Sequence, residues 1–127
     1  MFQEAFPILS VSNIEASLAF YRDQLEFAEV YRFPEHGDPA YVGLELGTSR
    51  LGIGADPSAL SQEGRPTALD RPFDLWVYAD DCDVAVDRLR SEGVHVDEGP
   101  ADQPWGERIA RVKDPDGNRV IIAGRAG

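Results

Sequence analysis

The sequence contains one arrangement of residues twice, and this internal repeat constrains the fold more than any other feature. An offset of 68 residues aligns the start of both halves, pairing Leu9 with Val77, Ile14 with Cys82, Leu18 with Val86 and Arg22 with Arg90. An offset of 69 residues places Arg50-Leu51-Gly52-Ile53 on Arg119-Val120-Ile121-Ile122. Chance self-similarity is the alternative in a chain of this size. Predicted turns, caps and strands agree at a nearly constant offset, and this agreement favours tandem duplication.

The second half ends in the most explicit local signal, a β-hairpin predicted over residues 104–123. Its turn, Asp114-Pro115-Asp116-Gly117-Asn118, combines a proline that fixes φ with a glycine that accepts positive φ. The two aspartates can accept hydrogen bonds from free turn amides. Ahead of the hairpin, Trp105 lies on a loop between Pro104 and Gly106, where it either covers the core or contacts a flat apolar molecule.

The remaining patterns complete two modules with the element order βαβββ. Strands are predicted at 6–11, 28–33, 40–46, 49–55, 73–79 and 94–97. One helix begins after Asn13 and continues as far as Leu25, with Ile14, Leu18, Tyr21 and Leu25 on one face. A second begins after Asp80 or Asp81 and ends at Gly93. A polar, proline-rich loop over 56–72 joins the halves. The sequence thus predicts a single α+β domain over 1–127, with modules of about 1–58 and 70–127.

Composition argues against nucleic acid as a partner and bears on disulfides and location. The chain has 12 Lys+Arg against 23 Asp+Glu, a net charge of −11, which argues against nucleic acid and is compatible with a cationic ligand. Cys82 is the sole cysteine and cannot form an intrachain disulfide. No apolar run reaches membrane-spanning length, and the N-terminus lacks the features of a signal peptide, so a cytoplasmic location is expected.

Three segments together carry a family resemblance: SNIEASLAFYRDQLEF, ELGTSRLGIG and KDPDGNRVIIA. With the tandem βαβββ order, they resemble the glyoxalase/bleomycin resistance protein/dioxygenase (vicinal oxygen chelate) superfamily. The resemblance implies that each module forms a curled mixed sheet and that paired modules surround an open-sided cleft. Enzymes of that superfamily hold a divalent metal in the cleft with His, Glu or Gln from the first and last strands of the modules.

At the corresponding positions this chain has one carboxylate and three residues without a metal-binding side chain. They are Phe6 and Asp74 on the first strands and Ile121 on the last strand, with its counterpart near Gly52. One carboxylate cannot hold a metal that needs several donor atoms. No Ser or Thr has a histidine at motif spacing, so no nucleophile–base pair is evident. The sequence therefore predicts a binding protein with no metal or other cofactor, rather than an enzyme.

Further segments resemble one group of proteins within that superfamily. QPWGERIARVKDPDGN, AFPILSV and FDLWVYADD look like bleomycin-resistance-type proteins. This implies sequestration of an aromatic antibiotic, cationic or neutral, that is bleomycin-like or another flat cytotoxic natural product. It also implies a homodimer with an exchanged N-terminal strand. Two alternatives remain: a metal-dependent lyase or dioxygenase of the same superfamily, and an accessory protein that binds a metabolite.

Strand alternation selects the candidate ligand-binding residues. Trp76 and Tyr78 share one face of their strand with Asp74, while the helix is expected to cover Leu75 and Val77. Aromatic residues opposite glycines in the first module predict a slot, although ordinary core packing is the alternative. The full predicted set is Phe6, Tyr31, Phe33, Gly52, Gly54, Asp74, Trp76, Tyr78, Trp105 and Ile121. Solvated surface positions are expected for Glu45, Glu107, Arg50, Arg108 and Arg119.

Overall fold

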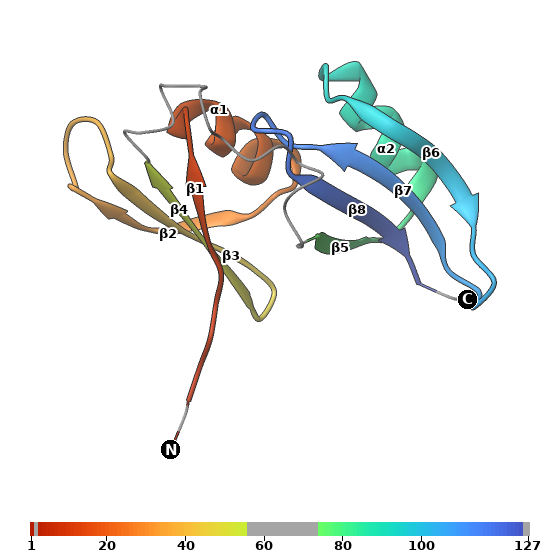
Figure 1. Ribbon diagram of the computed structural model, residues 1–127, viewed down its shortest axis with the longest axis horizontal. Coiled ribbons are helices and arrows are strands. Elements are labelled where there is room, and N and C mark those ends of the chain that lie inside the picture. Colours follow the sequence, from red (N-terminus) through yellow and green to blue (C-terminus); the bar gives the residue numbers. More distant parts are fainter. Residues whose placement is uncertain (2, 56–73, 126–127) are drawn as a thin grey trace, which may run out of the picture. The chain divides into compact units, whose positions relative to one another are not determined.

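The computed structural model describes residues 1, 3–55 and 74–125 (Figure 1). The chain divides into two compact units, Met1–Arg65 and Pro66–Gly127. Each unit contains a four-stranded mixed sheet with helical structure packed on it, which confirms the predicted α+β class and the βαβββ element order. The loop predicted over 56–72 lies outside the described residues. Within the described ranges, no helix is both long and apolar enough to span a bilayer.

The first unit contains sheet A, whose strand order is β1-β4-β3-β2. Its elements are β1 (Ile8–Val11), α1 (Ile14–Leu18), the π-helix η1 (Ala19–Gln24), β2 (Ala28–Phe33), β3 (Tyr41–Leu46) and β4 (Ser49–Ala55). Strand β1 pairs with β4 in parallel, and the other pairs are antiparallel.

The second unit repeats this topology in sheet B, with the strand order β5-β8-β7-β6. Its elements are β5 (Leu75–Ala79), α2 (Cys82–Ser91), β6 (Val96–Asp102), β7 (Arg108–Lys113) and β8 (Arg119–Gly124). Strand β5 pairs with β8 in parallel. The register agrees with the sequence repeat, because Leu9 lies opposite Ile53 in sheet A and Val77 lies opposite Ile122 in sheet B. The predicted duplication is therefore present in the strand pairing.

Both helix starts are capped as the sequence predicts. The side chain of Asn13 accepts a hydrogen bond from Ala16 N at 3.0 Å, and that of Asp81 accepts one from Val84 N at 3.1 Å. The expectation of one continuous α-helix as far as Leu25 is wrong. The helix widens into η1, whose wider turn brings the adjacent rings of Phe20 and Tyr21 into the core with edge-to-face contact.

Two predicted strand boundaries also need correction. Strand β1 begins at Ile8 rather than residue 6, because Pro7 has no backbone N–H and contributes only its carbonyl, which accepts from Gly52 N. Strand β6 runs from Val96 to Asp102 rather than over 94–97. Its polar sequence hides the strand signal, and its pairing with β7 is irregular, as an edge strand with glycine and proline permits.

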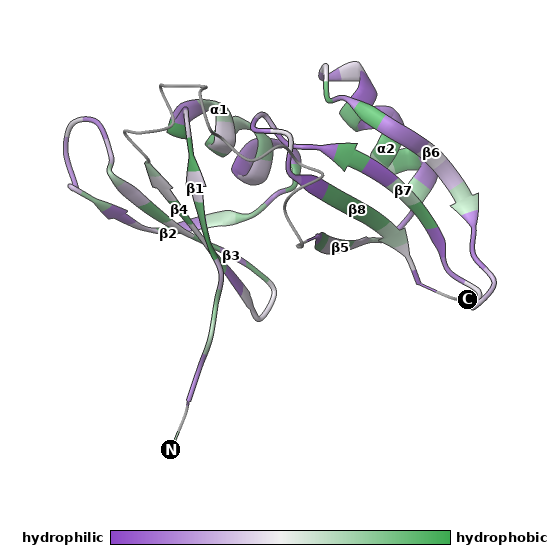
Figure 2. Cartoon of the chain, in the orientation of Figure 1, coloured by the Kyte–Doolittle hydropathy of each residue, from purple (hydrophilic) through white to green (hydrophobic). Residues whose placement is uncertain are grey.

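Each sheet buries one face beneath its helix. In sheet B the helical residues Cys82, Val86 and Leu89 pack on the face that carries Val77 and Ile122, and all five are buried. Hydrophobic residues follow β8 in the middle of this sheet, whereas the edge strand β6 is mostly polar (Figure 2). Sheet A likewise buries one face, with Val42, Leu44, Leu51 and Ile53. The opposite face of each sheet, here called the open face, carries the side chains at alternate positions.

The turn between β7 and β8 is organised by a buried carboxylate. Asp114 is 5% exposed and accepts hydrogen bonds from Asp116 N at 2.9 Å, Asn118 N at 2.7 Å and Asn118 Nδ2 at 2.7 Å. Gly117 has φ of 84°, a left-handed conformation that glycine adopts without a Cβ clash. The turn predicted from Asp-Pro-Asp-Gly-Asn is confirmed.

The substitution Asp114→Ala should lower the free energy of unfolding by about 2–3 kcal/mol, because it leaves amide donors without their charged acceptor. Denaturant unfolding followed by circular dichroism measures this. The control is Asp87→Ala, which removes an exposed carboxylate of α2 that lies 3.8 Å from Arg90 Nη1. This substitution should change stability by less than about 0.5 kcal/mol. Equal effects of the two substitutions would contradict the assigned role of Asp114.

Candidate functional site

The open face of sheet B carries a cluster of exposed aromatic side chains. Trp76 and Tyr78 project from β5 on the side opposite buried Val77, as strand alternation predicts. Trp105 lies in the loop between β6 and β7. The three side chains are 39%, 41% and 58% exposed, respectively. Large aromatic rings usually bury far more of their surface than this, so the cluster is a candidate contact surface.

A single carboxylate orients two of these three rings. Glu107 accepts a hydrogen bond from Trp105 Nε1 and another from the Tyr78 hydroxyl, each at 2.7 Å. The short loop that carries Trp105 is also closed by backbone bonds, from Gln103 N to Glu107 O at 2.7 Å and from Gly106 N to Gln103 O at 3.0 Å. The indole is therefore held in place although it is largely exposed.

Tyr78 has further contacts on its ring. The guanidinium carbon of Arg125 lies 3.8 Å from the ring centroid, a cation–π geometry. The ring of Trp76 meets that of Tyr78 edge-on, with centroids 6.1 Å apart. The hydrogen bond to Glu107 raises the pKa of Tyr78. In return, the hydrogen bond from Tyr78, followed by that from Trp105, lowers the pKa of Glu107.

The sequence did not predict that Glu107 and Arg125 belong to this cluster. Glu107 is accessible to solvent as expected, and its carboxylate in addition joins two aromatic side chains. Strand alternation could have placed Glu107 here, because it lies two positions before Ile109, whose side chain is on the open face of sheet B. Arg125 follows the last strand, and no sequence pattern predicts its contact with the Tyr78 ring. The two roles considered for Trp105 stay open, because its side chain is 58% exposed but Ile109, Ile121 and Ala123 on the same face of sheet B form a buried cluster.

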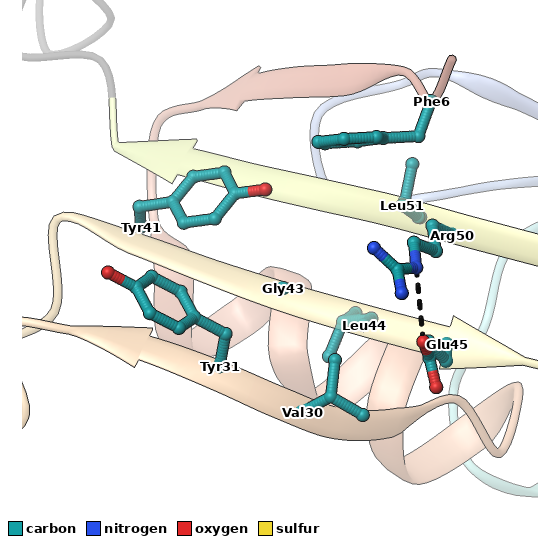
Figure 3. Close-up of a pocket in the computed structure, with 9 residues that line it drawn as sticks. All are labelled: Phe6, Val30, Tyr31, Tyr41, Gly43, Leu44, Glu45, Arg50 and Leu51. Carbon is teal, nitrogen blue, oxygen red and sulfur yellow. Dashed lines mark hydrogen bonds and ion pairs between the residues drawn. The ribbon is translucent and has the colours of Figure 1, made fainter. Parts of the chain in front are cut away.

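The open face of sheet A contains a pocket of about 370 Å³ (Figure 3). It is lined by Phe6, Val30, Tyr31, Tyr41, Gly43, Leu44, Glu45, Arg50 and Leu51. Phe6 and Tyr31 were predicted site residues and both line it. Arg50, expected to be a surface charge, also lines the pocket and bonds Glu45 through Nε at 3.1 Å. Strand pairing brings these residues together, because Tyr31 lies opposite Gly43 and Glu45 lies opposite Arg50.

The expectation of an open slot above Gly52 is wrong, because Tyr41 occupies that space. A Cβ built on Gly52 would lie 2.5 Å from the Tyr41 hydroxyl oxygen and 2.8 Å from Tyr41 Cε2. Glycine at position 52 therefore admits an aromatic ring. The predicted residues Phe33, Gly52 and Gly54 are absent from the lining, although Phe33 is 60% exposed. Tyr41 was missed, but the predicted hairpin register places it on the face of the glycines.

Comparison with known proteins decides the family. Residues 5–122 match the model of the Glyoxalase/Bleomycin resistance protein/Dioxygenase superfamily. The chain belongs to this superfamily. The resemblance found in the sequence motifs is thereby confirmed at the superfamily level.

Three known proteins are similar to this chain along most of their length. The chain is 27% identical over 122 residues to the uncharacterized protein YraH of Bacillus subtilis (strain 168), covering 90% of this chain and 91% of YraH. The structure of TioX from Micromonospora sp. ML1 is 17% identical with a TM-score of 0.74, and 98% of each chain is covered. Lactoylglutathione lyase from Agrobacterium tumefaciens is 23% identical with a TM-score of 0.68, covering 95% of this chain and 92% of that one. At these identities the two structures establish the fold.

The metal site of the superfamily's enzymes does not fit the residues present here. Of the four corresponding positions, Phe6, Gly52 and Ile121 offer no side-chain donor atom. The fourth, Asp74, is ion-paired with Arg119 Nε at 2.6 Å, so its charge is already compensated. Ile121 is only 7% exposed. Within residues 1, 3–55 and 74–125, no three His, Cys, Asp or Glu side chains gather in a metal-binding geometry.

The hydrogen bond between Trp105 and Glu107 should persist to a lower pH than the ordinary pKa of a glutamate would allow. Because the folded-state pKa of Glu107 is lowered, its hydrogen bonds are complete above the ordinary glutamate pKa of about 4.3 and are lost as pH falls through the lowered value. The measurement is Trp105 fluorescence during acid titration of Trp76→Phe, in which Trp105 is the sole tryptophan. The further variant Glu107→Gln should lack this transition. A transition near pH 4.3 that Glu107→Gln leaves unchanged would contradict the role of Glu107.

Proposed function

We propose that this protein binds and sequesters a flat aromatic antibiotic or a similar cytotoxic natural product, and thereby confers resistance without chemically changing it. One observation carries the proposal: Trp76, Tyr78 and Trp105 are exposed together on the open face of sheet B, and Glu107 fixes two of them. A planar ligand can stack on such rings without requiring them to move.

Energetics support this role for the cluster. An aromatic contact contributes roughly 0.5–1.5 kcal/mol beyond the burial of area. Side chains that are already ordered lose little conformational entropy when a ligand binds, and this preorganisation raises affinity. The Glu107 hydrogen bonds order Trp105 and Tyr78 in advance.

The chemistry of the residues supports binding over catalysis. The superfamily's metal-ligand positions supply one carboxylate, which is paired with Arg119. Without several donor atoms these positions cannot hold a Lewis acid to polarise a substrate. The similarity to TioX and to a lactoylglutathione lyase establishes a shared fold, and a fold hosts binding proteins and enzymes alike.

Removing the exposed indole should weaken ligand binding while leaving the fold intact. Both tryptophans belong to the cluster, so saturable quenching of intrinsic fluorescence by planar antibiotics of the bleomycin and related flat classes identifies a ligand. For that ligand, Trp105→Ala should raise Kd at least tenfold, about 1.4 kcal/mol, measured by calorimetry.

The matched control is Val84→Ala, which removes an exposed apolar side chain from α2, on the other face of sheet B. This variant should bind like the parent protein. If Trp105→Ala also bound normally but melted at a much lower temperature, Trp105 would be a structural residue and the proposed site would be wrong.

We further propose that the protein acts as a homodimer that exchanges its N-terminal strand, as the resemblance implies. The exposure of Ile8 and Phe33 on the open face of sheet A, 56% and 60%, supports self-association, because pairing would cover them. Light scattering at micromolar concentration should give about twice the chain mass of 14.0 kDa. A mass of one chain under those conditions would contradict the dimer.

A further inference from the structure

Arg125 differs in its contacts from the arginines on the strands of sheet B. It follows β8, and its guanidinium carbon lies 3.8 Å from the centroid of the Tyr78 ring. Within residues 1, 3–55 and 74–125, Arg125 forms no ion pair and no hydrogen bond. The arginines on the strands each pair with a carboxylate: Arg108 with Asp83, Arg111 with Glu98 and Arg119 with Asp74.

The ring of Tyr78 positions the Arg125 guanidinium. A cation over an aromatic ring is attracted by the electron-rich face, and this contact leaves the N–H donors of the guanidinium without an oxygen acceptor. Tyr78 is itself held by the hydrogen bond from its hydroxyl to Glu107 at 2.7 Å and by the edge-on ring of Trp76. The N–H donors of Arg125 therefore lie beside the exposed rings of the cluster.

Glu107 is less available to a charged ligand than Arg125 is. Its two oxygens already accept hydrogen bonds from Trp105 Nε1 and from the Tyr78 hydroxyl, each at 2.7 Å. A cationic group would have to share those oxygens, whereas an anionic group gains hydrogen bonds that Arg125 does not make within the described chain. Hydrogen bonds between a guanidinium and a carboxylate are among the strong ones in proteins. The net charge of −11 repels anions, but salt screens charges farther away than about 8–10 Å, so contacts within the site decide.

We infer that the sheet B site prefers a flat aromatic ligand that bears a carboxylate, and that Arg125 determines this specificity. The aromatic rings contact the plane of the ligand, and Arg125 donates hydrogen bonds to the carboxylate oxygens. This inference deepens the proposed function and rests on it, because it assigns an anionic group to the ligand of the same cluster.

Three compounds with one ring system test the charge preference. Indole-3-acetate is an anion, indole-3-acetamide is its neutral isostere, and tryptamine carries an ammonium group. In NMR titrations of the full ¹⁵N-labelled chain, the acetate should shift the indole N–H signals of Trp76 and Trp105 saturably. It should bind about three- to fivefold more tightly than the other two compounds. Equally tight binding of the acetamide or of tryptamine, or no saturable shift with the acetate up to its solubility, would overturn the inference.

Substitution of Arg125 shows whether this residue causes the preference. Arg125→Gln should lower the affinity for the acetate to that for the acetamide, and should change the affinity for the acetamide by less than about twofold. Tyr78→Leu should also reduce the ratio of the two affinities, because Arg125 then loses the ring that positions it. The control Arg90→Gln, which removes a guanidinium paired with Asp87 on α2, should keep the ratio of the parent protein. A ratio that Arg125→Gln leaves unchanged would overturn the inference.

Failure of this inference is distinct from failure of the proposed function. If planar antibiotics quench the tryptophan fluorescence saturably but the acetate is not preferred, only the assignment of an anionic group fails. If the acetate is preferred but no planar antibiotic quenches the fluorescence, sequestration of an antibiotic fails and the role of Arg125 stands.

Discussion

The structure depends on the parallel pairing of the first and last strands of each unit. A parallel pair cannot be joined by a tight turn, so the chain must cross over one face of the sheet, and α1 with η1 or α2 occupies that crossover. One crossover covers one face. The helical residues bury Val77 and Ile122 in sheet B, and the other face of that sheet is left without a helix. Both open faces therefore follow from strand topology.

The two units use their open faces differently. Sheet B places Trp76 and Tyr78 at its edge and fixes Tyr78, together with Trp105, through the carboxylate of Glu107. Sheet A pairs Gly52 with Gly43 at its centre, and the absence of side chains there admits the ring of Tyr41. The open face thus carries an aromatic cluster in one unit and an aromatic-walled pocket in the other.

Local features of the fold were predictable from sequence because their causes are local. The caps at Asn13 and Asp81, the turn at Asp114 and the repeat depend on residues a few positions apart or on a constant offset. Strand alternation also predicted the open-face positions of Trp76 and Tyr78.

Features that depend on tertiary contact were not predictable. Glu107 meets Tyr78 across 29 positions of the chain, and only the folded sheet reveals that bond. The ring of Tyr41 fills the space over Gly52 because β3 and β4 are paired in one register. The π-helical turn at Phe20 and Tyr21 likewise reflects packing, which overrides the helical period in the sequence.

We propose that Glu107 holds Trp105 and Tyr78 in place for a ligand before the ligand binds. The most direct measurement is the indole N–H signal of Trp105 in a ¹H–¹⁵N NMR spectrum of the free protein. A hydrogen bond to the carboxylate at 2.7 Å predicts a downfield-shifted signal with slow hydrogen exchange, which moves when a planar antibiotic is added. A Trp105 signal at the position of a solvated indole, with fast exchange and no response to such ligands, would contradict the claim.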